Sequence, residues 1–404
     1  MMDRRRFLLN CGKSLLLLPA SALAARAAGP SKSETVSLFL SGDVMTGRGI
    51  DQVLPKPSDP GLHERWVTDA RRYLELAQSA NGPFPRRVDF AYPWGDVLDE
   101  LNRAKPDVRI INLETSITES DDFQPNKGIH YRMHPGNVPC ITAAGIDCCV
   151  LANNHVLDWG MAGLEDTLAS LQQAQVKTTG AGRTASEAEA PAVIRIGRKG
   201  RVLVFAYASR SAGVPRKWAA TESRPGVSYL PDMSLKTARR IGSRVKSSKQ
   251  PGDIVVASIH WGSNWGYDVP REQRTFARTL IDEAGVDVVH GHSSHHPKGI
   301  EVYNGRPILY GCGDFLNDYE GIDGHEQYRG DLTLMYLVTM RPASGRLVRL
   351  EMVPFCIRQF RLNRASADDV RWLATTMDRE CGRFGSHVEL SNSNRLTLVS
   401  GQAV

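Results

Sequence analysis

The sequence lacks the features that would identify several common classes of protein. No two cysteines are spaced as CxxC, so a zinc–thiolate site is not predicted. No block of five or six like charges occurs, and basic residues do not interleave with aromatic ones, so we expect no nucleic-acid partner. No internal repeat or long linker divides the chain. What remains is a globular composition, 41% hydrophobic and 23% charged.

The N-terminus has the composition of an export signal. A basic head at residues 4–8 reads RRRFL, the short apolar segment 14–18 follows, and small-x-small cleavage sites lie at 22–24 and 25–27. We interpret residues 1–28 as a signal peptide, because the apolar segment is too short to span a bilayer and follows Lys13 directly. The RRxFL pattern resembles the twin-arginine signal; a Sec signal with extra arginines is the alternative. We therefore expect an exported protein of the periplasm or cell envelope.

Removing residues 1–28 changes how the net charge is interpreted. That segment carries five basic residues and one acidic residue, so the net charge falls from +6 to about +2. The mature chain is therefore too nearly neutral for its charge to identify a partner. Disulfides between the remaining cysteines are compatible with an oxidising compartment, but the sequence does not determine their pairing. Cys148 and Cys149 lie in an apolar run that predicts core.

Short apolar runs that end directly in polar residues recur along the chain. They occupy residues 36–40, 108–111, 148–151, 254–259, 286–289 and 307–310. Such runs are typical of strands buried on both faces. Helices are predicted over 159–175, with Asp158 as N-cap, and over 271–284, ending at Gly285. The alternation predicts an α/β fold with a largely parallel sheet, whose ligands bind beyond the carboxyl ends of the strands.

The polar residues at these strand ends are metal-ligand types. Four histidines crowd into residues 290–296, and the candidates are Asp43, Glu114, Asn154, His155, His260, His292 and His295. Carboxylate, amide and imidazole groups together suit Zn²⁺, Mn²⁺ or Fe rather than Ca²⁺. The set is large enough for two metal ions that share a carboxylate.

These segments resemble a known family. GDVM at 42–45, NLE at 112–114, ANNHVLDWG at 152–160, HWG at 260–262, GHSSH at 291–295 and IEVY at 300–303 are similar to the CapA family of poly-γ-glutamate capsule synthesis proteins. That family belongs to the calcineurin-like metallophosphoesterase superfamily. The resemblance implies a layered metallophosphoesterase-like β-sandwich flanked by helices over residues 34–360. A C-terminal helix and tail would follow over 361–404, with a helix at 368–381 and loose order after Ser391.

The resemblance also implies roles for individual residues. Asp43 would be the first metal-binding aspartate and Glu114 the bridging carboxylate, and the other ligands would be Asn154, His260, His292 and His295. His155, with Asp158 beside it, would be the catalytic group that stabilises charge or protonates the leaving group. The implied cofactors are two divalent transition metal ions, Mn, Zn or Fe. Among the clustered histidines, His290 would only pack, and His296 has no family counterpart.

The sequence departs from the family pattern near the metal ligands. Met45 stands two residues after Asp43, where phosphoesterases carry a metal-binding histidine, so one metal position loses a ligand. The HWG motif is followed by SNW, whereas the family has a glutamate after this motif. Two serines separate His292 from His295. Asp314 stands where the family has asparagine, and its negative charge would offset part of the charge lost through these changes.

The function implied is that of an exported CapA-like protein of poly-γ-glutamate capsule or envelope polymer biosynthesis with a dimetal hydrolase site. Its partners would be an anionic polymer or phosphoester substrate and a capsule-synthesis membrane complex. Arg48 and Arg132 are predicted to bind the anionic substrate, because guanidinium groups suit carboxylate and phosphate. One alternative is a periplasmic metal-dependent phosphoesterase. Another, which Met45 favours, is a non-catalytic factor that binds or assembles an anionic polymer.

Overall fold

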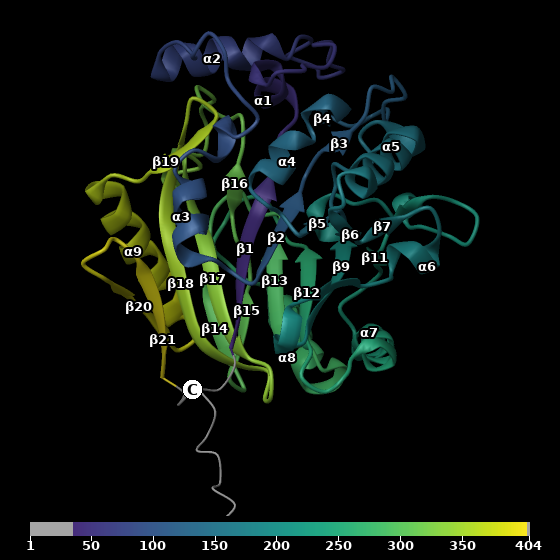
Figure 1. The fold of residues 1–404 in the computed structure, drawn as a ribbon, viewed down its shortest axis with the longest axis vertical. Helices are drawn as coiled ribbons and strands as arrows, with labels where there is room; N and C mark the ends of the chain where they lie inside the picture. The colour runs from purple at the N-terminus through teal and green to yellow at the C-terminus, as the bar shows by residue number, and fades with distance from the viewer. Residues whose placement is uncertain (1–34, 402–404) are drawn as a thin grey trace, which may run out of the picture. The chain divides into compact units, whose positions relative to one another are not determined.

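The computed structural model describes residues 35–401, in which strands and helices alternate (Figure 1). The signal peptide predicted for residues 1–28 lies outside this range. Among the helices of the described residues, none combines the length and apolar character needed to cross a membrane.

The larger sheet has ten strands and contains the first predicted strand at its centre. Its parallel half joins β1, β2, β5 and β6, whereas its other half is antiparallel. In spatial order the strands are β20 (Ser386–Leu390), β21 (Leu396–Ser400), β18 (Arg346–Arg358), β17 (Leu332–Arg341), β1 (Val36–Val44), β2 (Val108–Leu113), β5 (Cys148–Val150) and β6 (Lys177–Thr179), with β16 (Asp314–Leu316) beside β1 and β19 (Arg361–Arg364) beside β18.

The second sheet has seven strands and a parallel centre. Strands β9, β12, β13 and β15 run parallel, and antiparallel strands pair with β9 and β15. In order, the strands are β11 (Tyr229–Leu230), β9 (Arg201–Ser209), β12 (Ile254–His260), β13 (Val288–His292), β15 (Arg306–Leu309) and β14 (Ile300–Tyr303), with β8 (Ala192–Arg195) beside β9. Two short pairs complete the strands: β3 (Ser116–Ile117) with β4 (Arg132–Met133), and β7 (Ala181–Gly182) with β10 (Gly226–Val227).

The side chains of the second sheet alternate between two hydrophobic clusters. Val204 and Val256 pack in the same cluster as Leu38 and Ile110 of the larger sheet, whereas the neighbouring Phe205 packs with α7 (Leu235–Ser248) and α8 (Arg271–Ala284). Because successive side chains of a strand point to opposite faces, one face meets the other sheet and one meets helices. The predicted layered β-sandwich flanked by helices is therefore confirmed.

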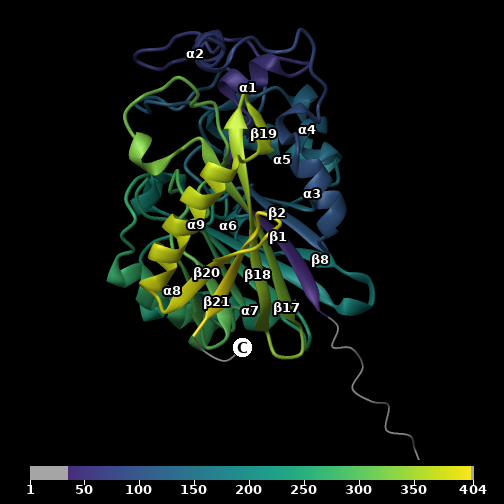
Figure 2. The ribbon, with the colours of Figure 1, turned by 90° about the vertical axis from the view of Figure 1, so that its left-hand side faces the viewer.

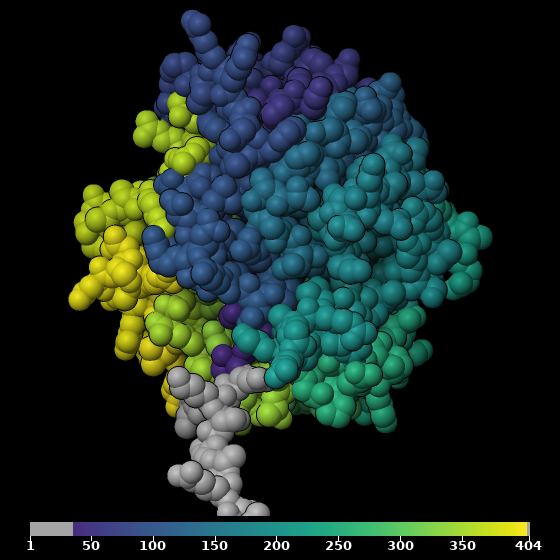
Figure 3. Space-filling view, viewed as in Figure 1, coloured from purple at the N-terminus to yellow at the C-terminus, as the bar shows by residue number. Residues whose placement is uncertain are grey.

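The remaining helices and long connections cover the sheets and their ends. The helices are α1 (Arg48–Val53), α2 (Arg71–Asn81), α3 (Val97–Ala104), α4 (Pro139–Ala143), α5 (Gly160–Gln173), α6 (Ala185–Ala188) and α9 (Ala367–Gly382). The arrowheads of β1, β2, β12 and β13 point toward the end covered by α1 and α2 (Figure 1). In the space-filling view, the purple and blue residues that follow β1 form a continuous surface there (Figure 3). The carboxyl ends of the strands therefore lie beneath this segment.

The helix predictions are correct except for one cap. Helix α8 has the predicted bounds, and Gly285 ends it with φ 71°. Helix α5 begins at Gly160, and its N-cap is Trp159, without a side-chain capping bond. The prediction that Asp158 caps this helix is wrong, because its carboxylate binds other groups, described below.

The C-terminal segment contains more structure than a helix and tail. Helix α9 covers the predicted 368–381 and lies alongside β20 and β18 (Figure 2). Strand β21 pairs with both β18 and β20. The expected loose order after Ser391 is therefore wrong up to residue 400, because Leu396 and Leu398 are buried in the main core.

Candidate metal centre

The registers of the two sheets bring the predicted residues together. On β1, Asp43 stands opposite Asn112 of β2 and Asp314 of β16, and on β12 His260 stands opposite His292 of β13. A hydrogen bond of 2.8 Å from His290 Nε2 to the Ser41 carbonyl oxygen links the two sheets just below these positions. The strand ends of both sheets therefore contribute to one site.

Three of the predicted ligands form a buried cluster. Asp43, His260 and His292 each offer a ligand atom, and these atoms lie within 4.8 Å of one another. The Nδ1 atoms of the two histidines are 2.8 Å apart, and His292 Nδ1 is 3.7 Å from Asp43 Oδ1. The other ring nitrogens contact Asn154 Oδ1 at 2.8 Å and Ser258 Oγ at 2.9 Å. Such outer contacts fix the orientation of histidines that bind a metal.

The protonation states in this cluster fit a divalent cation. Burial lowers the pKa of His260 and of His292 well below the usual value, so both rings are neutral, the form that binds metals. Burial, with repulsion from Asp314, raises the pKa of Asp43 to about 7. Burial and the neighbouring Asp43 also raise the pKa of Glu114 well above its usual range. A bound cation would favour the ionised form of both carboxyl groups.

Glu114 lies between the histidine cluster and the predicted catalytic group. Its Oε1 is 3.7 Å from His155 Nε2 and 3.9 Å from His260 Nε2. The side-chain nitrogen of Asn112 donates to Asp43 at 2.7 Å and to Glu114 at 3.1 Å. Asn112 therefore holds the two carboxyl groups together, as expected for a pair that shares a cation.

His155 and Asp158 form a buried pair with Lys127. His155 Nδ1 is 2.7 Å from Asp158 Oδ2 and 2.9 Å from Lys127 Nζ, and Lys127 also forms an ion pair with Asp158. The amide of Tyr131 donates to Asp158 Oδ2 at 2.7 Å. Burial lowers the pKa of His155 to about 4, so its ring is neutral near pH 7. Burial raises the pKa of Asp158, but attraction to His155 and Lys127 outweighs this and leaves it below its usual value.

Neither His295, a predicted ligand, nor Met45, which stands where the family pattern has a histidine, belongs to the cluster of three. His295 Nδ1 contacts both carboxylate oxygens of Asp314, at 2.8 and 3.0 Å, and its Nε2 is 2.8 Å from Asn264 Nδ2. Although burial opposes the charge, Asp314 raises the pKa of His295. Met45 is fully buried, and its Sδ accepts a hydrogen bond from the Tyr319 hydroxyl at 3.6 Å. His295 therefore lies outside the cluster of three, and Met45 adds no nitrogen ligand.

Other residues of the histidine-rich segment pack inside the protein. His290 binds Ser258 Oγ and the Ser41 carbonyl oxygen. His296 stacks on Tyr328, with ring centroids 4.5 Å apart. The peptide N–H of Ser293 donates to Asp43 Oδ2 at 3.1 Å, in a backbone conformation with φ 100°.

The two arginines predicted to bind substrate are held by protein groups. Arg48 donates to both carboxylate oxygens of Asp318, and its guanidinium lies 3.9 Å from the Tyr73 ring centroid. Arg132 donates to the carbonyl oxygens of Ser120 and Asp59 and lies 3.8 Å from the Trp159 ring centroid. That these two arginines bind an anionic substrate stays a prediction.

The structure adds residues that sequence reasoning did not assign to the site. Asn112 and Lys127 contact the predicted residues directly, and Ser258 orients His292. Asn153 fixes the turn at the end of β5, because its Oδ1 accepts the amides of His155 and Val156, each at 3.0 Å. Asn112 and Asn153 stand within the NLE and NNH motifs, so their position beside ligands was the available signal. Lys127 lies in a loop that is distant in sequence from its partners, so no motif identified it as a site residue.

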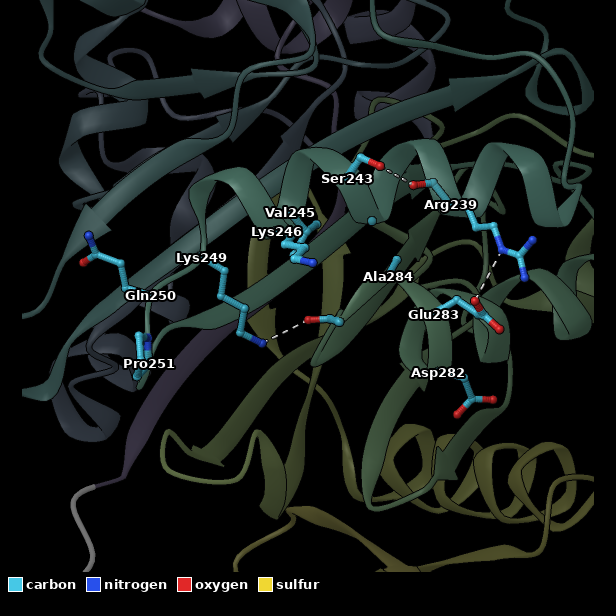
Figure 4. A pocket seen from close by; sticks show the side chains of 12 residues that line it. Arg239, Ser243, Val245, Lys246, Lys249, Gln250, Pro251, Asp282, Glu283 and Ala284 are labelled. Atoms are coloured by element: carbon cyan, nitrogen blue, oxygen red, sulfur yellow. Dashed lines mark hydrogen bonds and ion pairs between the residues drawn. The ribbon is translucent and has the colours of Figure 1, made fainter.

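A surface cavity of about 800 Å³ lies elsewhere on the protein (Figure 4). It is bordered by the ends of α7 and α8 that precede β12 and β13, and so lies at the opposite ends of these strands from His260 and His292. Lys249 and Arg239 there are paired with protein acids, Asp287 and Glu283. None of the predicted site residues lines this cavity.

The sequence matches the family described as bacterial capsule synthesis protein PGA_cap over residues 37–319. The chain belongs to this family. Two relatives from strains of Mycobacterium tuberculosis, each named a probable polyglutamine synthesis accessory protein, are 48% identical over 367 residues, covering 91% of this chain and 96% of theirs. The resemblance drawn from the strand-end motifs is thereby confirmed.

More distant relatives match smaller parts of the chain. The PGA biosynthesis protein CapA of Bacillus subtilis is 29% identical over 209 residues, which cover 51% of this chain and 52% of that protein. The capsule biosynthesis protein CapA of Bacillus anthracis is 26% identical over 294 residues, 71% of this chain and 61% of that one. Among solved structures, a phosphatase from Mycoplasma pneumoniae has a TM-score of 0.44 at 9% identity, covering 84% of this chain and 97% of that one. A likeness at this level carries no conclusion about activity.

Proposed function

We propose that this PGA_cap protein is an exported, metal-dependent hydrolase of capsule or envelope polymer biosynthesis, acting on a polymer of the poly-γ-glutamate type. The observation that carries the proposal is the buried cluster of Asp43, His260 and His292 beside the His155–Asp158 pair. The polymer class is drawn from the names of the CapA and polyglutamine-synthesis relatives. A capsule-synthesis membrane complex is the partner we propose for it.

The residues of the site divide into metal ligands and proton-transfer groups. Asp43, His260 and His292 would hold the metal, and Glu114 and Asn154 lie beside them. A transition metal bound there would supply Lewis acidity and lower the pKa of a water molecule. His155 Nδ1 lies 2.7 Å from the Asp158 carboxylate, which accepts a hydrogen bond from Nδ1–H and orients the ring. With Nδ1–H held there, a proton taken up at Nε2, which faces Glu114, can be given to a leaving group.

We propose one tightly held metal ion and a second, weaker position. The cluster of three ligands supports the tightly held ion. Met45, which offers no nitrogen, and the pairing of His295 with Asp314 support weaker binding at the second position. Metal analysis of natively exported protein should find at least one Mn, Zn or Fe ion per chain, and Asp43→Ala and His292→Ala should lose it. Protein that carries no transition metal after native export would contradict this proposal.

Hydrolysis is tested with polymer and with phosphoester substrates. The metal-loaded protein should cleave γ-linked glutamate or glutamine oligomers, and His155→Ala should reduce the rate by roughly 10²-fold or more while metal content stays unchanged. Turnover of an aryl phosphodiester, but not of the oligomers, would favour the periplasmic phosphoesterase. Polymer binding without cleavage of either substrate, with Mn²⁺, Zn²⁺ or Fe²⁺ present, would favour the non-catalytic assembly factor.

A further inference from the structure

The end of the molecule at which the parallel strands begin lies opposite the candidate metal centre. Strand β1 starts there at Val36, and the antiparallel β17 ends there, because Val36 stands opposite Met340. The β8–β9 and β17–β18 hairpins and the turns that follow α7 and α8 lie at the same end (Figure 1). Asp43 and His292 stand near the carboxyl ends of β1 and β13, so this face points away from them.

Hydrogen bonds connect neighbouring turns of this end into one surface. They join the β8–β9 hairpin to the start of β2 and to the end of α7, and the start of β15 to the β17–β18 turn. The bonds run from Lys199 Nζ to Asp107 Oδ1 at 2.8 Å, from Arg201 Nη2 to the Ser248 carbonyl oxygen at 3.0 Å and from Arg306 Nη2 to the Ser344 carbonyl oxygen at 3.2 Å.

This surface carries cations that no protein group neutralises. Among residues 35–401, none forms an ion pair or a side-chain hydrogen bond with five of them, which we call the basic end face: Lys105, Arg195, Arg198, Lys246 and Arg341. The first four are exposed and Arg341 is half-buried. Helix α7, which carries Lys246 in its last turn, contains no acidic residue.

The acidic side chains of this end do not offset these charges. Three of them pair with other cations: Asp107 with Lys199, Asp253 with Arg201, and Asp287 with Lys249. Two exposed acids, Asp282 and Glu283, end α8, and Glu283 pairs with Arg239. The basic end face is therefore positively charged, although the net charge of the chain without residues 1–28 is only about +2.

The N-terminal segment joins the fold at this same end, because β1 begins at Val36. Residues 1–28 contain five basic residues and one acidic residue, with an apolar stretch at 14–18. In charge, this segment does not complement the basic end face. Both instead complement a surface of anionic lipid headgroups, which attracts clustered lysine and arginine side chains.

We propose that the basic end face binds the surface of an anionic lipid bilayer and thereby directs the candidate metal centre away from the membrane. Each of its five cations can lie within one Debye length of the headgroups, about 10 Å at 0.1 M salt, so their attractions add. The inference requires neither a bound metal nor hydrolysis, and it goes beyond the proposed function.

The direct test measures binding to lipid vesicles by sedimentation. The protein is the chain from residue 29 onward, which contains the whole fold of residues 35–401 without the basic and apolar N-terminal segment. We expect binding to vesicles of phosphatidylcholine mixed with phosphatidylglycerol, little binding to phosphatidylcholine alone, and loss of binding as salt rises from about 0.05 M to about 0.5 M. Equal binding to both kinds of vesicle, or to neither, would overturn the proposal.

Two variants with the same change in net charge test whether this face makes the contact. Arg198→Glu combined with Lys246→Glu should weaken binding to the anionic vesicles at least roughly tenfold. Arg71→Glu combined with Arg72→Glu changes two exposed arginines of α2, at the opposite end, and should leave binding nearly unchanged. Urea unfolding verifies that both variants are folded. Equal weakening by both pairs would assign the attraction to net charge and reject the face.

The orientation on the bilayer has a readout of its own. In a Cys356→Ser background, which removes the half-buried cysteine, a fluorophore is attached at Lys246→Cys or at Arg72→Cys. Spin-labelled lipid should quench the first and not the second; the reverse order would overturn the proposal. Binding of soluble γ-linked polyglutamate through Arg198 and Lys246, without binding to anionic vesicles, would assign the face to a polymer and also overturn it.

Discussion

At the scale of single residues, Met45 has the largest consequence for the metal centre. Its thioether lies in the buried site two residues after Asp43, and its sulfur accepts only a weak hydrogen bond from Tyr319. Thioether sulfur is a poor ligand for Mn²⁺ or Zn²⁺, which favour imidazole and carboxylate. The chemistry of one side chain would therefore limit the second metal position that we propose.

Met45→His should restore a nitrogen ligand beside Asp43. We expect metal content to rise from about one to about two ions per chain, because a second position would then have an imidazole as well as the nearby carboxyl groups. Metal analysis after dialysis measures this, with Met45→Leu as a control of similar volume that should stay at one. A Met45→His protein with unchanged metal content would show that ligand identity at residue 45 is not limiting.

At the scale of elements, α8 positions the strand that carries His292. The helix ends at Gly285 in the left-handed conformation, and β13 begins three residues later. A Cβ at Gly285 would meet only Val245 Cγ1, at 3.9 Å, so backbone conformation and not space requires glycine.

Gly285→Ala should destabilise the protein by about 1 kcal/mol, because alanine resists positive φ. Urea unfolding measures the change. Gly382→Ala is the matched control: it lies at the exposed end of α9, without positive φ and with no atom within 4 Å of a new Cβ, and should be neutral or slightly stabilising. Equal destabilisation by both substitutions would contradict the role of the left-handed cap.

The connection between β13 and β14 contains a buried lysine. Lys298 is 4% exposed, and its Nζ donates to the Asp268 carbonyl oxygen at 3.2 Å. Burial lowers its pKa to about 8; the nearby Asp268 opposes this shift and Arg383 adds to it. Since the folded pKa lies below the unfolded value, the charged form costs stability below pH 8, and this cost disappears as the pH rises toward 10.

The advantage of Lys298→Met over the wild type should therefore depend on pH. At pH 7 the variant should be more stable, by up to about 3 kcal/mol, and the difference should shrink between about pH 8 and pH 10 as wild-type Lys298 loses its proton. Urea unfolding at several pH values measures this. Lys246→Met, at an exposed lysine of α7, should change stability little throughout. A difference for Lys298→Met that is constant with pH would contradict the assignment.

At the scale of the whole molecule, the candidate metal centre contains residues of both sheets. Asp43 belongs to the larger sheet, whereas His260 and His292 belong to the second sheet. These groups come together only when both sheets are folded and packed, so a metal bound here favours the folded state over the unfolded chain.

A bound metal ion should therefore raise the free energy of unfolding, by an amount that grows with the ratio of the metal concentration to its Kd. Zn²⁺ or Mn²⁺ at about one hundred times its Kd should add about 2.7 kcal/mol to the free energy of unfolding. Thermal unfolding with metal and with a chelator measures this, and Asp43→Asn should abolish the difference. A metal effect that persists unchanged in Asp43→Asn would place the ion elsewhere.

The sequence by itself determined the family, the alternation of strands and helices, and the residues at the strand ends. Apolar runs followed by Asp43, Glu114, Asn154 or His260 are local patterns, and such patterns can be recognised in the sequence without knowledge of the fold. Only the tertiary structure decided which of these residues meet: the registers between strands unite Asp43, His260 and His292, whereas His295 turns to Asp314. Lys127 could not be predicted for the same reason, because its partners, His155 and Asp158, lie far away in the chain. Register and packing are long-range properties, set by burial of both sheets in one core, and no short segment contains them.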